Sequence, residues 1–300
     1  MAVTYRAARA EDVASMAAIL RSASNALSRQ HGFPEMPPGS RQPFQLFSVQ
    51  QEPEGCWIAE DAASVVGFAI SWIRGELWFL SQLFIAPSVQ GHGVGQALIE
   101  RALAHGGNAA DNRALITFAY NPVSISLYVR HAMYPREPLY VLDGAAGAFQ
   151  AGPRAAEGLE YEPVRANATN AQVLGRLDQA VLGIERTRHH EFFLSQPDST
   201  CYLFEHAGVP NGYAYVWSSG RVGPLAAVSP GSFAGVMRSA LVLAARSPTR
   251  GVSLLLAGSN EPALAWALGH GMRITRPLLL MATKPFGRLD AYGFHSPGLL

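Results

Sequence analysis

The sequence predicts a protein of the α/β class, in its α+β form, built as two tandem lobes, each a mixed and mostly antiparallel sheet flanked by helices. One observation is an internal repeat that spans nearly the whole chain. The other is the order of elements within each copy, where hairpin strands come first and a strand–helix–strand unit comes last. A length of 300 residues is enough for two domains with cores of their own.

The repeat is visible as ungapped blocks. Residues 56–75 align with 201–220 and share seven identities over 20 positions. Residues 121–133 then align with 260–272, with Asn, His and Met at the same spacing. Chance similarity between two alanine-rich strands is the alternative, but a second block in the same order argues against it. We therefore divide the chain into a first lobe at 1–145, a linker at 146–158 and a second lobe at 159–300.

Hydrophobic periodicity and turn residues predict the elements of the first lobe in order. They are a strand at 4–8, a helix at 11–26, a proline-rich loop at 31–43, three strands within 56–87, a glycine turn at 90–95 with a helix at 96–104, a strand at 114–120, a helix at 122–131 and a strand at 139–143. Asn121 followed by Pro122 is a strong helix-start signal. Consecutive hairpins do not fit a doubly wound nucleotide fold, which needs helices between most strands.

Composition excludes several classes. The formal net charge is +1 and 15% of residues are charged, so no basic surface for nucleic acid is expected. Cys56 and Cys201 fit neither a disulfide framework nor a zinc site, and no metal is expected. No apolar run approaches a membrane span or a signal peptide. We expect a cytoplasmic protein, monomeric or homodimeric.

Chemistry is concentrated at a glycine-rich turn, Gln90-Gly91-His92-Gly93-Val94-Gly95, that follows an apolar strand and opens a helix. Backbone N–H groups at such a turn can surround a phosphate group. Glycines without a Cβ allow the sharp turn and a close approach of the anion. A tight strand–helix connection without a ligand is the alternative, and the flanking residues decide between the two.

The run from Leu83 to Leu98 resembles the acyl-CoA-binding motif of the GNAT superfamily of N-acyltransferases, with Gln90, Gly93 and Gly95 at its motif positions. The run from Asn121 to Tyr128 is similar to the family's second motif, in which Asn and Tyr stand seven residues apart. The resemblance covers the first lobe and extends to the second through the repeat.

The resemblance implies acetyl-CoA as co-substrate. The backbone of Leu83, Phe84 and Ile85 would pair with the pantetheine arm as an added strand does. The pyrophosphate would lie on Gly91, His92, Gly93, Val94, Gly95 and Gln96, with Gln90 beside them. Asn121 would bind the cofactor arm while capping its helix, and Tyr128 would protonate the departing thiolate as general acid. A packed aromatic side chain is the alternative for Tyr128.

The general base is the weak point of the resemblance. Many members carry a Glu or His on the strands at 78–85 or 114–120, and here both strands lack one. Two candidates are Glu76, at the start of its strand, and the C-terminal carboxylate of Leu300, which serves as base in some tandem-lobe relatives. A disordered tail is the alternative for Leu300. Ser81, Gln82 or Tyr120 could instead orient a water.

The second lobe is expected to have lost the chemistry. With the preceding strand taken as about two residues shorter, Phe233 replaces Gln90, Val236 replaces Gly93 and Arg238 replaces Gly95, and Ala267 stands in place of Tyr128. We expect a non-catalytic copy that walls the acceptor site. The alternative is a regulatory anion site that uses Arg186, Arg221 and Arg238.

The acceptor pocket is expected between the first two helices, and its lining residues include Phe33, Met36 and Phe44. Because Glu35 is the single carboxylate in this stretch, the sequence favours a small, partly apolar primary amine or an amino acid derivative over a polycation. The leading prediction is acetyl transfer to such an amine by direct attack in a ternary complex. The alternative is a non-catalytic acyl-CoA or ligand sensor; a dinucleotide-binding oxidoreductase is disfavoured by the glycine spacing.

Overall fold

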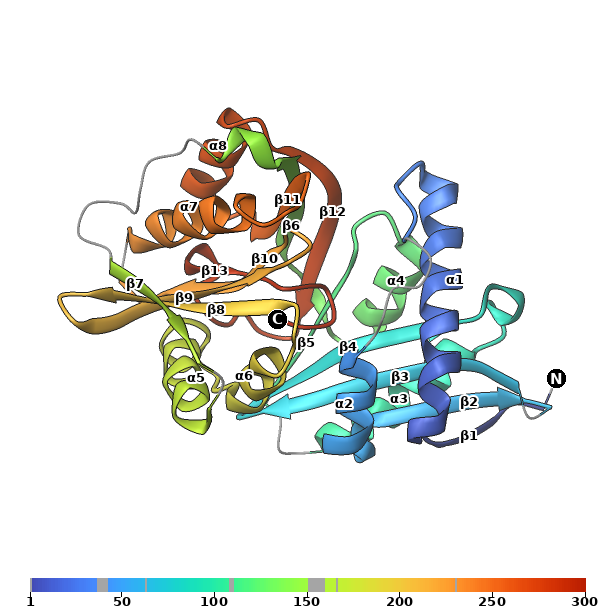
Figure 1. Ribbon diagram of the computed structural model, residues 1–300. Helices are drawn as coiled ribbons and strands as arrows, with labels where there is room; N and C mark the ends of the chain where they lie inside the picture. Colours follow the sequence, from blue (N-terminus) through green and yellow to red (C-terminus); the bar gives the residue numbers. More distant parts are fainter. Residues whose placement is uncertain are drawn as a thin grey trace. The chain divides into compact units, whose positions relative to one another are not determined.

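The computed structural model describes residues 2–36, 43–62, 64–107, 111–150, 160–165, 167–229 and 231–300. Within them the chain forms two compact units (Figure 1). Unit 1 comprises residues 1–134 and 281–284, and unit 2 comprises residues 135–280 and 285–300.

Unit 1 contains a sheet in the order β1-β2-β3-β4-β5, antiparallel except for the parallel pair β4 and β5. Its elements are β1 (Thr4–Ala7), α1 (Val13–His31), α2 (Pro43–Gln51), β2 (Cys56–Asp61), β3 (Ser64–Arg74), β4 (Leu77–Ile85), α3 (Val94–Gly106), β5 (Asn112–Phe118) and α4 (Pro122–Arg130). The first helix is longer than expected because it continues until Gly32, whose left-handed conformation ends it. The helix α2 was not predicted, and residues 37–42 of the expected proline-rich loop lie outside the described residues. The other predicted strands and helices are confirmed in order, with shifted ends.

Helices cover both faces of the unit 1 sheet (Figure 1). On one face, Met16 and Ile19 of α1 pack on Ile58, Phe68 and Ile70 of the strands in a buried apolar core. On the other face lies α3, where the Trp78 indole donates a 3.0 Å hydrogen bond to the Ala102 carbonyl. The sheet is therefore held rigidly between two helical layers, and its strand ends present the candidate site.

Unit 2 contains a sheet in the order β12-β6-β11-β13-β10-β9-β8-β7. Its elements are β6 (Tyr134–Ala145), β7 (Glu160–Val164), α5 (Ala168–Leu182), α6 (Thr187–Leu194), β8 (Ser199–His206), β9 (Val209–Trp217), β10 (Val222–Ala227), α7 (Ser232–Ala245), β11 (Gly251–Ala257), α8 (Glu261–Gly269), β12 (Arg273–Ala282) and β13 (Tyr292–Gly293). In Figure 1, α5 and α6 lie on one side of these strands and α7 and α8 on the other.

The internal repeat is evident in the element order. The series β1, α1, α2, β2, β3, β4, α3, β5, α4, β6 recurs as β7, α5, α6, β8, β9, β10, α7, β11, α8, β12. The fold class of two tandem lobes with mixed, mostly antiparallel sheets is therefore confirmed. One strand, β13 (Tyr292–Gly293), follows the second copy and has no counterpart among the described residues of the first.

The boundary drawn from the repeat at residue 145 differs from the boundary between the compact units. The strand β6 ends the first repeat, yet its residues pair with β11 in unit 2, from Gly251 opposite Ala145 to Ala257 opposite Leu139. The end of the second repeat belongs to unit 1, where the Thr283 amide donates to the Arg113 carbonyl at 2.9 Å. Each repeat thus contributes its last strand, wholly or in part, to the other unit.

Two further expectations concern the linker and membrane association. Of the expected linker 146–158, residues 151–158 lie outside the described residues; Ala146 and Phe149 are buried in the core of unit 2 and are not linker. Among the helices of the described ranges, none is both long and apolar enough to cross a membrane.

Candidate functional site

The glycine turn connects β4 to α3 and adopts the conformation that requires glycine. Gly91 and Gly93 have φ angles of +82° and +79°, and a Cβ built on either would meet nothing within 4 Å. The backbone here is therefore open to an approaching group on the side where a side chain would stand. Gly95 has a negative φ and an ordinary environment, so its lack of a Cβ is not imposed by the fold.

The turn leaves the N-terminus of α3 available to an anion. Gly93 is the N-cap residue and supplies no side-chain hydrogen bond to the first turn. The N–H groups at the start of a helix lack intrahelical acceptors, and the helix dipole favours negative charge there. Gln90 donates from Nε2 to the Ile85 carbonyl at 3.0 Å, and the His92 ring contacts the Gln90 carbonyl. These two side chains brace the turn itself.

An open strand edge lies beside the turn. Among the described residues, the parallel pairing of β4 with β5 runs only from Leu77 opposite Asn112 to Leu80 opposite Leu115. At the same place the register with β3 shifts, so that Ser81 forms a bulge. Pairing with β3 continues to Ile85, so the half-buried residues Leu83, Phe84 and Ile85 have one paired edge and one edge facing the opening between β4 and β5. An extended ligand can add to such an edge.

Asn121 and Tyr128 are joined through Ser124 on α4. Asn121 caps the helix by accepting from the Ser124 amide at 3.2 Å, and its Nδ2 donates to the Ser124 hydroxyl at 2.8 Å. Tyr128 is buried; burial raises its pKa to about 12, while a hydrogen bond with Ser124 lowers it by less. The phenol therefore keeps its proton at neutral pH and can act as a donor. The capping role of Asn121 is confirmed.

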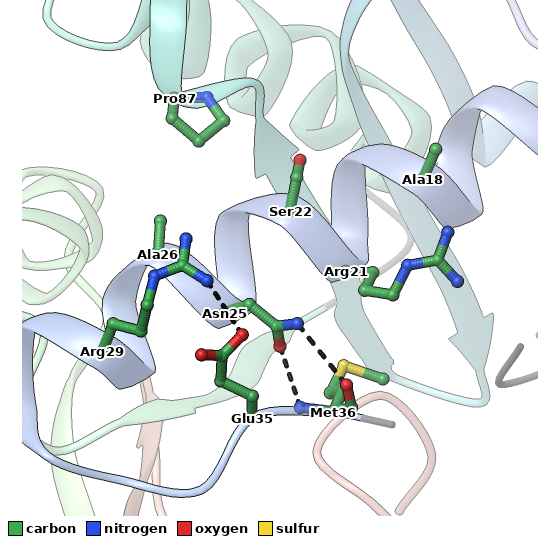
Figure 2. A pocket seen from close by; sticks show the side chains of 9 residues that line it. All are labelled: Ala18, Arg21, Ser22, Asn25, Ala26, Arg29, Glu35, Met36 and Pro87. Atoms are coloured by element: carbon green, nitrogen blue, oxygen red, sulfur yellow. Dashed lines mark hydrogen bonds and ion pairs between the residues drawn. The ribbon is translucent and has the colours of Figure 1, made fainter. Parts of the chain in front are cut away.

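The acceptor segment folds back over the end of β5. The Phe33 ring stacks on Tyr120 with centroids 4.1 Å apart, and the Asn25 side chain holds the Met36 backbone through both its amide and its carbonyl groups. Met36 borders a hollow of about 840 Å³ along α1, next to Pro87 (Figure 2). Phe44 is 5% exposed and packs with Phe47 on α2. Of the three predicted lining residues, Met36 lines this hollow, Phe33 lies against Tyr120, and Phe44 contributes to packing.

Charge in this hollow is mainly positive. Figure 2 shows Arg29 paired with Glu35, at 2.8 Å, while Arg21 points away from both. Among the nine described lining residues Glu35 is the single carboxylate.

Gln45 and Gln82 form a buried amide pair, of which the sequence analysis named only Gln82. Gln45 of α2 is fully buried and donates from Nε2 to Gln82 Oε1 on β4 at 3.0 Å. Its own Oε1 has no hydrogen-bond partner among the described residues. Gln82 neighbours the bulge at Ser81, so the pair lies on the acceptor-helix side of the open edge. Gln82 was a candidate to orient a water, but nothing in the sequence pairs it with Gln45, 37 positions away.

The two candidates for the general base differ in their surroundings. Glu76 is exposed in the turn between β3 and β4, at the opposite end of a nine-residue strand from the glycine turn, which is about 25 Å away. Leu300 is fully buried in unit 2, where its carbonyl oxygen accepts a hydrogen bond from Arg186. The tail is therefore folded rather than disordered, and its last residue is enclosed within unit 2.

Sequence comparison identifies the first lobe. Residues 20–133 match the model of the acetyltransferase (GNAT) family. The first lobe is a GNAT-family domain. A search of curated protein sequences found no significant match.

Solved structures extend the GNAT fold to the whole chain. An inferred acetyltransferase from Pyrococcus horikoshii is 18% identical, with a TM-score of 0.77 over 99% of this chain and 96% of that one. A GCN5-related N-acetyltransferase from Sphaerobacter thermophilus is 13% identical, with a TM-score of 0.64 over 96% and 98%. A tandem GNAT protein from the clavulanic acid biosynthesis pathway is 16% identical, with a TM-score of 0.64 over 95% and 99%. The chain thus has the tandem GNAT fold, and the family match of residues 20–133 supports acyl transfer as the general chemistry.

Proposed function

We propose that the first lobe is an N-acetyltransferase that moves an acetyl group from acetyl-CoA to a primary amine of a small molecule or amino acid derivative, in a ternary complex. The observation that carries this proposal is that unit 1 contains three features together. They are the free edge of β4, the uncapped glycine turn at α3 and the proton-bearing Tyr128.

Acetyl-CoA fits the residues present. Open space at Gly91 and Gly93 gives a diphosphate access to backbone N–H groups at the start of α3. The edge from Leu83 to Ile85 offers backbone partners to an extended arm that carries amide groups. When bound, the thioester supplies an activated acetyl group. In this proposal Asn121 holds the arm with the N–H of its amide that the helix cap does not use.

Tyr128 is the proposed general acid. Attack by the amine nitrogen forms a C–N bond at the carbonyl carbon and breaks the C–S bond, so the sulfur leaves with an electron pair. Tyr128 gives its phenolic proton to that sulfur and is reprotonated from solvent. Because its pKa lies near 12, the phenol is fully protonated at the start of each turnover.

The amine also loses a proton, and the open edge of β4 offers an amide pair instead of a carboxylate. We propose that Gln45 and Gln82 hold a water that takes this proton to solvent, with Gln45 Oε1 as a hydrogen-bond acceptor for the water. An amide cannot itself accept the proton at neutral pH, so the amine must arrive largely as the free base. Activity should therefore rise with pH through the pKa of the acceptor amine.

The hollow beside α1 supports a small acceptor without several positive charges. Arg21 and Arg29 outnumber Glu35, so a polyamine would meet net repulsion there. An amine that also carries a carboxylate would meet an arginine.

A panel assay that follows CoA release tests the proposal. Amino acids, amino acid amides, arylamines, aminosugars and polyamines would each be offered with acetyl-CoA. Turnover with at least one monoamine, weaker with polyamines, is expected. If acetyl-CoA binds but no amine in the panel releases CoA, the protein is instead an acyl-CoA sensor with a GNAT fold.

A further inference from the structure

The second lobe contains a strand where the first lobe has an opening. By element order, β10 and β11 correspond to β4 and β5. They form one parallel bridge, between Arg221 and Ser253, and then β13 lies between them and pairs antiparallel with both. The Phe294 amide at its end donates to the Leu255 carbonyl at 2.9 Å. A piece of the chain thus fills the position of the open cleft of the first lobe.

The backbone positions that bind this segment are the ones assigned to the cofactor arm in the first lobe. From the registers of β3 with β4 and of β9 with β10, Leu225 and Ala226 stand where Leu83 and Phe84 stand. The strand β13 pairs with Leu225 and Ala226. The segment therefore occupies the same strand edge by the same kind of contact.

Two further contacts follow the same path. Asn260 is the counterpart of Asn121; it caps α8 in the same way, and its Nδ2 donates to the Asp290 carbonyl. The Arg288 guanidinium donates to the Val228 carbonyl at 2.7 Å, at the end of β10 just before the turn into α7. Along residues 288–294 the segment therefore contacts first the end of β10, then Asn260, and finally the strand edges of β10 and β11.

A fully buried polar cluster anchors the segment. Arg186 donates to the Tyr292 hydroxyl and to the Leu300 carbonyl, while its Nε donates to Asp178 at 2.8 Å. Burial lowers the pKa of Arg186, but Asp178, Tyr292 and Tyr213 together raise it more, so the guanidinium stays charged. Arg221 donates to the His295 carbonyl at 2.8 Å. Two of the three arginines considered for a regulatory anion are therefore committed to the chain itself.

We propose that residues 288–295 are a built-in ligand of the second lobe, an extended peptide segment that permanently occupies the cleft corresponding to the acyl-CoA cleft of the first lobe. The second cleft is then a peptide site filled in cis and takes no acyl-CoA. The proposed function enters only in naming the ligand of the first cleft. The occupancy of the second cleft stands without it.

The fit of this segment provides a selective variant and a matched control. Gly223 has a φ of +140°, and a Cβ there would lie 2.4 Å from the Phe294 carbonyl oxygen, a backbone atom. Gly208, in the turn between β8 and β9, has a φ of +74° and nothing within 4 Å. Gly223→Ala therefore adds backbone strain and a collision with the segment, whereas Gly208→Ala adds strain alone.

Hydrogen exchange on the full-length protein, followed by mass spectrometry, tests the proposal. Without acetyl-CoA, amides at 292–296 should exchange about 100-fold or more below the unstructured rate, and saturating acetyl-CoA should leave them unchanged. Amides at 83–85 should gain protection only when acetyl-CoA is added. Gly223→Ala should accelerate exchange at 292–296 by about tenfold or more, and Gly208→Ala by less than about twofold. Titration should give one acetyl-CoA per chain.

Three results would overturn the proposal. They are exchange at 292–296 at the unstructured rate in the wild type, binding of two acetyl-CoA molecules per chain, and equal acceleration by the two glycine variants. The wild-type measurement decides even if Gly223→Ala does not fold. If the first lobe binds no acetyl-CoA at all, the proposed function fails while protection at 292–296 still supports the built-in ligand.

Discussion

The two lobes share an element order but differ in what lies on the face covered by their first two helices. In the first lobe, Phe68 and Ile70 of β3 belong to an apolar core. The matching positions of β9 are Tyr213 and Tyr215, both buried. Tyr213 donates to Asp178 at 2.6 Å, and Tyr215 lies 3.0 Å from a ring nitrogen of His190. A stable sheet of this fold therefore does not need the polar cluster, since the first lobe does without one.

The polar cluster around Asp178 and Arg186 instead fixes the position of the C-terminal segment. Replacing buried ionic groups by apolar ones is often neutral or stabilising, so a retained buried pair is best explained by the geometry it specifies. Here the pair of Asp178 and Arg186 ends on Tyr292 and Leu300. The first lobe is therefore expected to bind an external ligand, whereas the second lobe binds its own tail.

The glycine turns differ in a way that the sequence alignment misjudged. The helix α7 begins after Gly231, which has a φ of +80° and is its N-cap, as Gly93 is for α3. Gly231, not Val236, is therefore the counterpart of Gly93, and the position of Gly95 holds the buried Phe233. The alignment took the strand to be about two residues shorter, but β10 has six residues and β4 has nine. The connection from strand to helix also has four residues in place of eight. The second lobe keeps the turn but has a bulky side chain on the first turn of its helix.

The largest expected effect separates catalysis from binding. Tyr128→Phe should lower kcat by about tenfold to a hundredfold, because the leaving sulfur loses its proton donor, and should leave the Kd of acetyl-CoA unchanged. The second lobe has Ala267 at this position. Steady-state kinetics and calorimetric binding check this. A fall in kcat of less than twofold would remove Tyr128 from the mechanism.

The paired N-cap glycines test which lobe binds the cofactor. Gly93→Ala and Gly231→Ala place a Cβ at nearly identical φ angles in open space, so each should cost about 1–2 kcal/mol of stability. Gly93→Ala should also weaken acetyl-CoA binding by about tenfold, because the Cβ stands where the anion approaches. Gly231→Ala should leave affinity unchanged, and equal losses of affinity in calorimetry would contradict the assignment.

Replacing Gln82 by a carboxylate tests whether the amide pair lies on the path of the amine proton. Gln82→Glu places a titratable group beside Gln45, and a carboxylate there can accept the amine proton that water otherwise takes. We expect kcat/KM at pH 6 to rise a few-fold and the pH profile to flatten, with Gln82→Leu as the control that lowers activity at every pH. An unchanged profile in Gln82→Glu would place the proton path elsewhere.

Local sequence was sufficient for the fold and for the conformation of the glycine turn. The αL glycines and the cap at Asn121 depend on residues within a few positions of one another, and the repeat is visible as shared residues at the same spacing. All three could therefore be predicted. The tail strand could not, because Tyr292–Gly293 is too short for a periodicity and its partners lie 37 or more residues away along the chain. Likewise, Gln45 meets Gln82 only through the packing of α2 on the sheet.

The smallest effect concerns the pH dependence of the internal ligand. Burial, together with Arg221 and Arg186, holds the pKa of His295 well below its ordinary value, while its hydrogen bond to the Gly223 carbonyl opposes this. A ring that stays neutral when folded contributes stability that is intact above the ordinary histidine pKa and declines as the pH falls below it. His190 adds a loss of stability in the same pH window, since burial also lowers its pKa. Asp178, whose pKa is lowered, adds a loss of stability only at more acidic pH.

Exchange at 292–296, corrected for its intrinsic pH dependence, should rise a few-fold between pH 7 and pH 5, and His295→Asn should reduce that rise. If the variant keeps the full rise, His190 alone sets the pH response of the tail.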